Sequence, residues 1–89
     1  MRKQSVPIVN KLGLHARASA KLTQAAARFP CDVHVSRNGK RVNAKSIMGV
    51  MMLAAGVGST VEIETDGPEE EAAMAALVKL FADKFDEGE

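Results

Sequence analysis

A histidine and an arginine stand two positions apart where a loop leads into an expected helix. Residues 13–19 read G-L-H-A-R-A-S, which places His15 at the N-cap or one residue from it. The first N–H groups of a helix have no intrahelical partner and lie at the positive end of the helix dipole, which disfavours a protonated imidazole and suits a bound anion. Arg17 can add its planar guanidinium beside the backbone N–H groups of Ala16, Arg17 and Ala18. The pattern predicts a histidine that accepts a phosphoryl group and passes it on.

Other roles for His15 compete with this one, because a histidine near a helix start is often only a capping or surface residue. Zinc uses four ligands, and His34 is the only other histidine, with no soft ligand near it. We therefore expect no metal and no cofactor. A nucleophilic pair of His15 with Cys31 would lack a third group to orient it. We expect His34 to point to solvent from a strand and Cys31 to be a small buried apolar residue.

A second candidate site begins at Ser46, which can N-cap a short helix that extends to about Leu53. This helix is apolar around its whole circumference, with Ile47, Val50 and Leu53 on one face and three methionines on the rest. The methionines are Met48, Met51 and Met52. Such a helix is either buried on two sides or exposes an apolar patch, and methionine serves both as a core filler and as an adaptable partner contact. The residues alone leave both alternatives open.

The composition limits the class of protein. The chain has 89 residues with 46% hydrophobic and 26% charged, enough for one domain with one core. The longest uncharged run, residues 46–61, is shorter than the roughly 18–20 residues that a membrane span needs. One cysteine and no secretory leader favour a reducing cytoplasm. Residues 1–45 carry a net charge of +9 and residues 46–89 one of −8, so a basic surface that meets acidic or phosphorylated partners is expected.

The elements that must position these residues follow from periodicity. We expect strands over residues 5–9, 31–36, 40–44 and 60–65, with Pro7 placing the first at a sheet edge. Asn38-Gly39 indicates a hairpin turn. Helices are expected over residues 16–29, from Ser46, and after Asp66-Gly67-Pro68, with proline in the first turn of the last helix. The order β-α-β-β-α-β-α predicts a two-layer α+β domain, an antiparallel four-stranded sheet covered on one face by helices, with a later strand pairing between the first two.

At this point the chain resembles the HPr family, the histidine phosphocarriers of the bacterial phosphotransferase system. The resemblance rests on G-L-H-A-R and, thirty residues later, K-S-I-M-G-V-M, and it covers all of residues 1–89 as a single domain. It implies an open-faced β-sandwich with three helices, and a carrier rather than an enzyme. It also implies that His15 takes a phosphoryl group on Nδ1 from Enzyme I, itself phosphorylated by phosphoenolpyruvate, and that IIA domains receive it. Arg17 matches the family's conserved arginine.

The resemblance further implies that the helix from Ser46 docks on Enzyme I and on IIA proteins, through Ile47 and the three methionines. Lys21 and other flanking cations would complement acidic partner rims; the others are Arg17, Lys40, Arg41 and Lys45. Ser46 matches the serine that an HPr kinase phosphorylates in some members. We expect a cytoplasmic monomer without membrane insertion.

The family motif usually has proline where this chain has Ala18, and we expect the site to survive with a modest change in transfer rate. Two alternatives to the HPr assignment stay open. The nitrogen-related branch, NPr, uses the same chemistry for a regulatory output, and the alanine-rich helices favour it. A small RNA-binding domain would explain the basic half, although the chain has no Trp or Tyr and only three Phe for base stacking. We expect no nucleic-acid partner.

Overall fold

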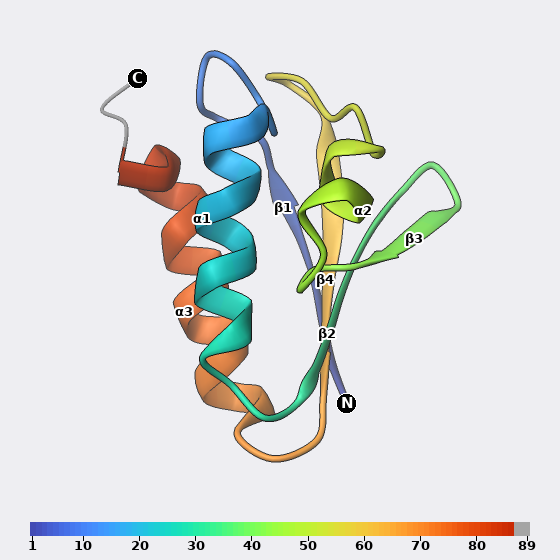
Figure 1. Ribbon diagram of the computed structural model, residues 1–89, viewed down its shortest axis with the longest axis vertical. Helices are drawn as coiled ribbons and strands as arrows, with labels where there is room; N and C mark the ends of the chain where they lie inside the picture. The colour runs from blue at the N-terminus through green and yellow to red at the C-terminus, as the bar shows by residue number, and fades with distance from the viewer. Residues whose placement is uncertain (87–89) are drawn as a thin grey trace.

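The computed structural model describes residues 1–86 of the protein (Figure 1). The last three residues of the domain expected over residues 1–89 lie outside the described residues. The strands are β1 (Arg2–Pro7), β2 (Asp32–Arg37), β3 (Lys40–Asn43) and β4 (Thr60–Asp66). The helices are α1 (Ala16–Ala27), α2 (Ile47–Met51), α3 (Glu70–Ala82) and the short 3-10 helix η1 (Lys84–Asp86). Apart from η1, this is the element order that the sequence predicts.

The four strands form one antiparallel sheet in the order β1-β4-β2-β3. β4 pairs with both β1 and β2, which confirms the expected insertion of a later strand between the first two. β1 lies at the edge of the sheet, as Pro7 predicts, because proline cannot donate a hydrogen bond to a second neighbour. Asn38 and Gly39 have φ angles of 52° and 82°, which confirms the hairpin between β2 and β3.

The helices cover one face of the sheet and leave the other open, which confirms the two-layer α+β architecture. Figure 1 shows α1 and α3 side by side, and α2 packs against both α1 and β3. Alternate side chains of the central strands are buried against the helices. Val33 and Ile63, one from β2 and one from β4, are at most 1% exposed. Arg41, which points to the open face, keeps 52% of its side chain exposed.

β1 begins and ends earlier than the apolar alternation predicts, at Arg2–Pro7 instead of residues 5–9. The polar residues at its start join the sheet because their backbones pair with β4, from Arg2 opposite Thr65 onward. Ile8 is 1% exposed and still bonds to Ser59, while Val9 is 39% exposed at the start of the next loop. Backbone pairing, which the side-chain pattern does not record, decided these boundaries.

The start of the last helix is a second correction. Proline was expected in its first turn, but α3 begins at Glu70, with Glu69 as N-cap in the left-handed conformation at φ 62°. Pro68 therefore precedes the helix. The sequence predicts no element after α3, yet Phe85 in η1 is fully buried. The centroid of its ring is 4.9 Å from the centroid of the Phe81 ring.

α1 is also shorter than expected, since it ends at Ala27 and Arg28 is its C-cap. None of the helices formed by residues 1–86 is long and apolar enough to cross a membrane.

Candidate functional site

His15 is the N-cap of α1, the position that the sequence predicts. Its backbone is extended, at φ −74° and ψ −179°, and its side chain makes no capping hydrogen bond to the helix. The side chain is half-buried, so the imidazole is neither enclosed in the core nor fully in solvent. The first turn of α1 contains no acidic residue. The N–H groups at this helix start therefore keep their preference for an anion.

The loop before His15 is held against the loop that precedes β4. Leu14 N–H donates to the carbonyl of Ala55 at 2.9 Å. Gly13 has a φ of +65°, and a Cβ on it would meet the Ala55 oxygen at 2.5 Å. Only glycine fits this close approach at a left-handed φ without a shift of the backbone. Gly13 thus sets the direction from which the chain enters α1.

The residues that follow His15 separate into exposed and buried positions. Ala16 and Arg17 are exposed, and among residues 1–86 no hydrogen bond or ion pair joins the side chain of Arg17 to another residue. Its guanidinium is available to an incoming anion. Ala18, expected as a third backbone donor, has no exposed surface. Neighbouring atoms therefore cover the N–H group of Ala18 in this conformation.

α2 begins at Ser46, as predicted, and its hydroxyl accepts a hydrogen bond from Gly49 N–H at 3.2 Å. The exposure of the methionines on α2 decides between a role as core fillers and an exposed apolar patch. Met48 is 71% exposed, Met51 40% and Met52 61%, with Ile47 at 43%. Val50 and Leu53 face the core instead, at 0% and 3%. We call the exposed four, Ile47, Met48, Met51 and Met52, the methionine surface; it is a patch and not a core filler.

Most of the cations expected to face a partner are engaged within the chain. Lys21 Nζ donates to the carbonyl of Phe85 at 2.7 Å, and Lys45 Nζ to that of Phe29 at 2.9 Å. Lys40 Nζ lies 3.3 Å from the Met52 carbonyl, near the end of α2. Backbone carbonyls near helix ends lack intrahelical partners and attract such cations. Lys21 in particular is turned towards the C-terminal part of the fold.

Arg41 is likewise occupied, on the open face of the sheet. Its guanidinium donates to Glu64 at 2.6 Å. This bond is the main cause that lowers the pKa of Glu64, and the charges of Arg41, Lys3 and His34 lower it further. Burial of the carboxyl acts in the opposite direction. His34 pairs across the sheet with Glu64 and is half-buried, less open to solvent than expected. Of the expected rim cations, only Arg17 is without a partner among residues 1–86.

Two exposed apolar residues near His15 were missed by the sequence reasoning. Leu12 is 61% exposed and Val57 59% exposed. They lie on the two loops that the bond from Leu14 to Ala55 joins. A leucine in a loop beside glycine was the available signal, since an apolar residue there has no strand or helix face to bury.

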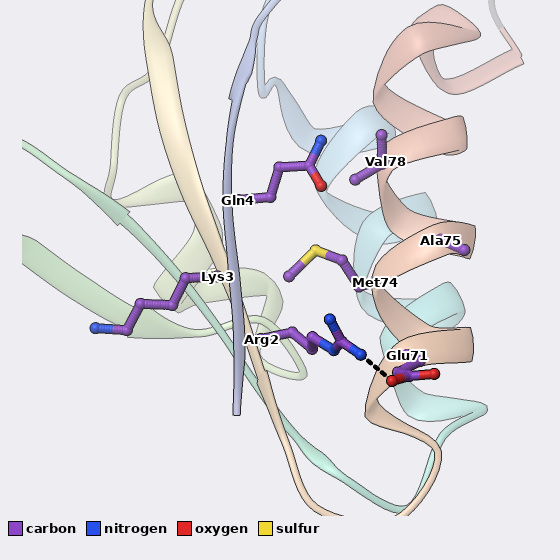
Figure 2. A pocket seen from close by; sticks show the side chains of 7 residues that line it. All are labelled: Arg2, Lys3, Gln4, Glu71, Met74, Ala75 and Val78. Carbon is purple, nitrogen blue, oxygen red and sulfur yellow. Dashed lines mark hydrogen bonds and ion pairs between the residues drawn. The ribbon is translucent and has the colours of Figure 1, made fainter.

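The remaining candidates lie away from this region. A hollow of about 420 Å³ opens between β1 and α3, lined at one side by Arg2, Gln4 and Lys3 and at the other by α3 residues that include Met74 (Figure 2). An ion pair between Arg2 and Glu71 crosses it. Its β1 residues are at the start of that strand, whereas the loop that carries His15 follows the end of the strand. Cys31 is a buried free thiol, as expected. Residues 1–86 contain no group of three or more His, Cys, Asp or Glu side chains suited to a metal ion.

Comparison with known proteins identifies the family. Residues 2–83 match the family described as "PTS HPr component phosphorylation site". The chain is 65% identical to the phosphocarrier protein HPr of Cupriavidus necator over 89 residues, which cover 100% of both chains. It is 58% identical to HPr of Neisseria meningitidis serogroup A over 89 residues, again the full length of both. The crystal structure of an HPr from Thermoanaerobacter tengcongensis superimposes with a TM-score of 0.94 at 44% identity and covers 98% of each chain.

These relatives carry the HPr name, which does not favour the NPr alternative, and they give no support to an RNA-binding domain. The partners of a protein of this kind are other components of the phosphotransferase system. The chain belongs to the HPr family, the phosphocarrier proteins of the phosphotransferase system, and is a carrier rather than a catalyst.

Proposed function

We propose that His15 is the residue of this phosphocarrier that is phosphorylated, on Nδ1, by phospho-Enzyme I, and that IIA proteins receive the group. The observation that carries the proposal is the position of His15 as the N-cap of α1, at the positive end of the helix dipole, with an exposed Arg17 two residues further on. The half-buried position of His15 limits the motion of its side chain without closing it off.

The transfer itself needs only the lone pair of the imidazole. That pair forms the N–P bond while the bond from phosphorus to the donor atom of Enzyme I breaks, and its electrons return to the donor. The guanidinium of Arg17 and the N–H groups of Ala16 and Arg17 then face the phosphate oxygens and balance their charge. The Ala18 N–H becomes a third donor only if the atoms over it move. A site with so few donors at the surface releases the group as readily as it accepts it.

We assign the docking of both partners to the methionine surface. Its four exposed apolar side chains lie on α2, which packs against α1, so that a protein seated there is close to the start of α1. Methionine side chains adapt to differently shaped surfaces, which suits a carrier with two kinds of partner. Leu12 and Val57 extend the apolar area, and a partner that covers them would exclude water from the transfer. Lys21 contacts a docked partner only if its hydrogen bond to the Phe85 carbonyl breaks.

We further propose that Ser46 is a regulatory phosphorylation site for an HPr kinase. Its hydroxyl is half-buried and already turned to the first turn of α2. A phosphate there would add about −1.5 to −2 charges at a helix start, which tolerates them, next to a surface that must meet acidic partners. Docking would weaken while the fold persists.

The whole chain, residues 1–89, is proposed to be a single domain that acts as a monomer in the cytoplasm. Pro7 and Lys3 on the edge strand β1 oppose pairing of two sheets edge to edge. A buried free thiol at Cys31 is typical of a reducing compartment. Light scattering on the purified protein measures the oligomeric state directly.

The decisive experiment incubates the protein with Enzyme I and phosphoenolpyruvate and scores acid-labile, alkali-stable phosphate. We expect one phosphate on the wild type and none on His15→Ala. His34→Ala is the matched control, because it removes the only other histidine, and it should be phosphorylated normally. Phosphate on His15→Ala, or its loss from His34→Ala alone, would assign the chemistry to a different residue.

A further inference from the structure

The two carbonyl groups directly before His15 are each held by a fully buried polar side chain. Asn10 Nδ2 donates to the carbonyl of Gly13 at 2.8 Å. Ser19 Oγ donates to the carbonyl of Leu14 at 3.1 Å. Both Asn10 and Ser19 are 0% exposed. Consecutive peptide units are therefore tied down at the point where the chain enters α1.

Ser19 holds His15 from the other side as well. Its backbone N–H donates to the carbonyl of His15 at 2.8 Å. Its hydroxyl and its N–H thus bind the carbonyls on either side of the His15 backbone. Because peptide units are planar and trans, fixing these carbonyls fixes the orientation of both units. The position of the imidazole then depends on the side-chain torsions of His15 alone.

The choice of residue types supports a role beyond packing. Position 19 lies on the buried face of α1, between Ala18 and Leu22, which are both 0% exposed. Alanine there would favour the helix more than serine and would bury no polar atom. Asn10 likewise occupies a buried place where burying an amide is costly unless it is hydrogen-bonded. What both polar side chains share is the segment Gly13–Leu14 that precedes His15.

We propose that Asn10 and Ser19 are positioning residues that aim the imidazole of His15 at the incoming phosphorus atom. The proposal rests on the proposed role of His15. Phosphoryl transfer needs the attacking atom nearly in line with the leaving atom, and a displacement of about 1 Å can lower a rate by about 100-fold. The two residues act through the backbone of His15 and touch neither the phosphate nor the partner.

The variant that tests this is Ser19→Ala, which removes one hydroxyl and keeps a good helix former. Its matched control is Thr23→Val, which removes a hydroxyl one turn further along the same helix, where Thr23 Oγ1 has no hydrogen-bond partner among residues 1–86. Asn10→Ala tests the second bond. Rates of phosphorylation by Enzyme I are measured against Enzyme I concentration, at a temperature where circular dichroism shows every variant folded.

We expect Ser19→Ala to lower the rate at saturating Enzyme I by about tenfold and to leave the half-saturating concentration unchanged. Thr23→Val should change neither. A variant that is less stable but still fully folded would keep both the rate at saturating Enzyme I and the half-saturating concentration of the wild type. A Ser19→Ala rate equal to that of Thr23→Val would overturn the proposal, even if Asn10→Ala failed to fold. A wild type that takes up no phosphate would instead overturn the role of His15 itself.

Discussion

The starts of α1 and α2 have the same kind of backbone but use their cap residues in opposite ways. His15 and Ser46 are both N-caps in an extended conformation. The Ser46 hydroxyl accepts the N–H of Gly49 at 3.2 Å, which satisfies its own helix. The imidazole of His15 makes no such bond to α1. One helix start is capped by the side chain of its own N-cap residue, and at the other start the N-cap side chain makes no bond to the first turn.

The difference shows how a small domain divides stability and function between its helices. A good cap stabilises a helix by about 1 kcal/mol, and α1 gives up that stabilisation at His15. α1 tolerates the loss because it has 12 residues and a buried face that packs on the core. α2, with only five residues, depends more on its cap. The candidate site therefore lies at the start of the helix that depends less on a capping bond.

The largest effect is expected from giving α1 the cap of α2. His15→Ser should abolish phosphate uptake, because no imidazole remains. It should also be more stable than His15→Ala by about 1 kcal/mol, with a Tm higher by about 4–8 °C, because serine caps the first turn and alanine does not. Phosphate assays and thermal melts followed by circular dichroism measure both. His15→Ala is the control; if the serine variant is no more stable than the alanine variant, the first turn of α1 is already satisfied.

The next largest effect concerns the arginine beside the open cap. Arg17→Gln removes a charged donor worth about 1.5–3 kcal/mol, which corresponds to a loss of about 10- to 150-fold in the rate of phosphorylation by Enzyme I. Stopped-flow or quench measurements give this rate. Arg28→Gln removes an exposed arginine at the other end of α1. It should leave the rate within about twofold, because Arg28 is farther from His15 than the distance over which salt screens exposed charges. Equal losses in the two variants would mean that net charge, and not the local donor, is responsible.

Two substitutions of Ser46 separate the effect of its cap on stability from the effect of added charge on phosphoryl transfer. Ser46→Ala should lower the free energy of unfolding by about 1 kcal/mol and leave phosphate uptake by His15 unchanged. Ser46→Asp keeps a capping oxygen, so stability should stay near that of the wild type, while the added charge slows acceptance from Enzyme I. Urea denaturation and the phosphorylation assay test the pair. Unchanged transfer in Ser46→Asp would contradict the proposed regulation by charge.

The smallest effect is expected at the third helix start, where Glu70 Oε1 accepts the N–H of Gly67 at 3.0 Å. This bond first, and the nearby terminal ammonium of Met1 second, lower the pKa of Glu70 below its ordinary value of 4.5. A carboxyl with a lowered folded-state pKa stabilises the fold above its unfolded pKa and loses this contribution as pH falls through the folded value. The free energy of unfolding should therefore decline below about pH 4.5.

Glu70→Gln should flatten that decline, as measured by urea denaturation at pH 7, 4 and 3. Glu69→Gln is the neighbouring control, because it removes one negative charge and leaves the bond between Glu70 and Gly67 in place. An equal flattening in both variants would attribute the slope to overall charge instead of to the bond with Gly67.

The sequence predicted those features that depend on neighbours along the chain. Asn38-Gly39 indicated the hairpin because the two residues tolerate a positive φ, and Ser46 indicated a cap because its hydroxyl reaches only a few residues ahead. The placing of His15 at a helix start came from the same local logic. Pro68 shows the limit of that logic, because the turn closed by Glu70 moved the start of α3 two residues on.

Tertiary structure alone decided which side chains are free to act. Lys21 and Phe85 are 64 residues apart, yet a bond between them turns the lysine away from its expected role. Met48 is exposed only because Val50 and Leu53 fill the core beneath α2. Asn10 is an ordinary loop residue in the sequence and a buried donor in the fold. Periodicity and capping act over one or two turns, whereas burial and partner choice depend on segments that meet only after the chain has folded.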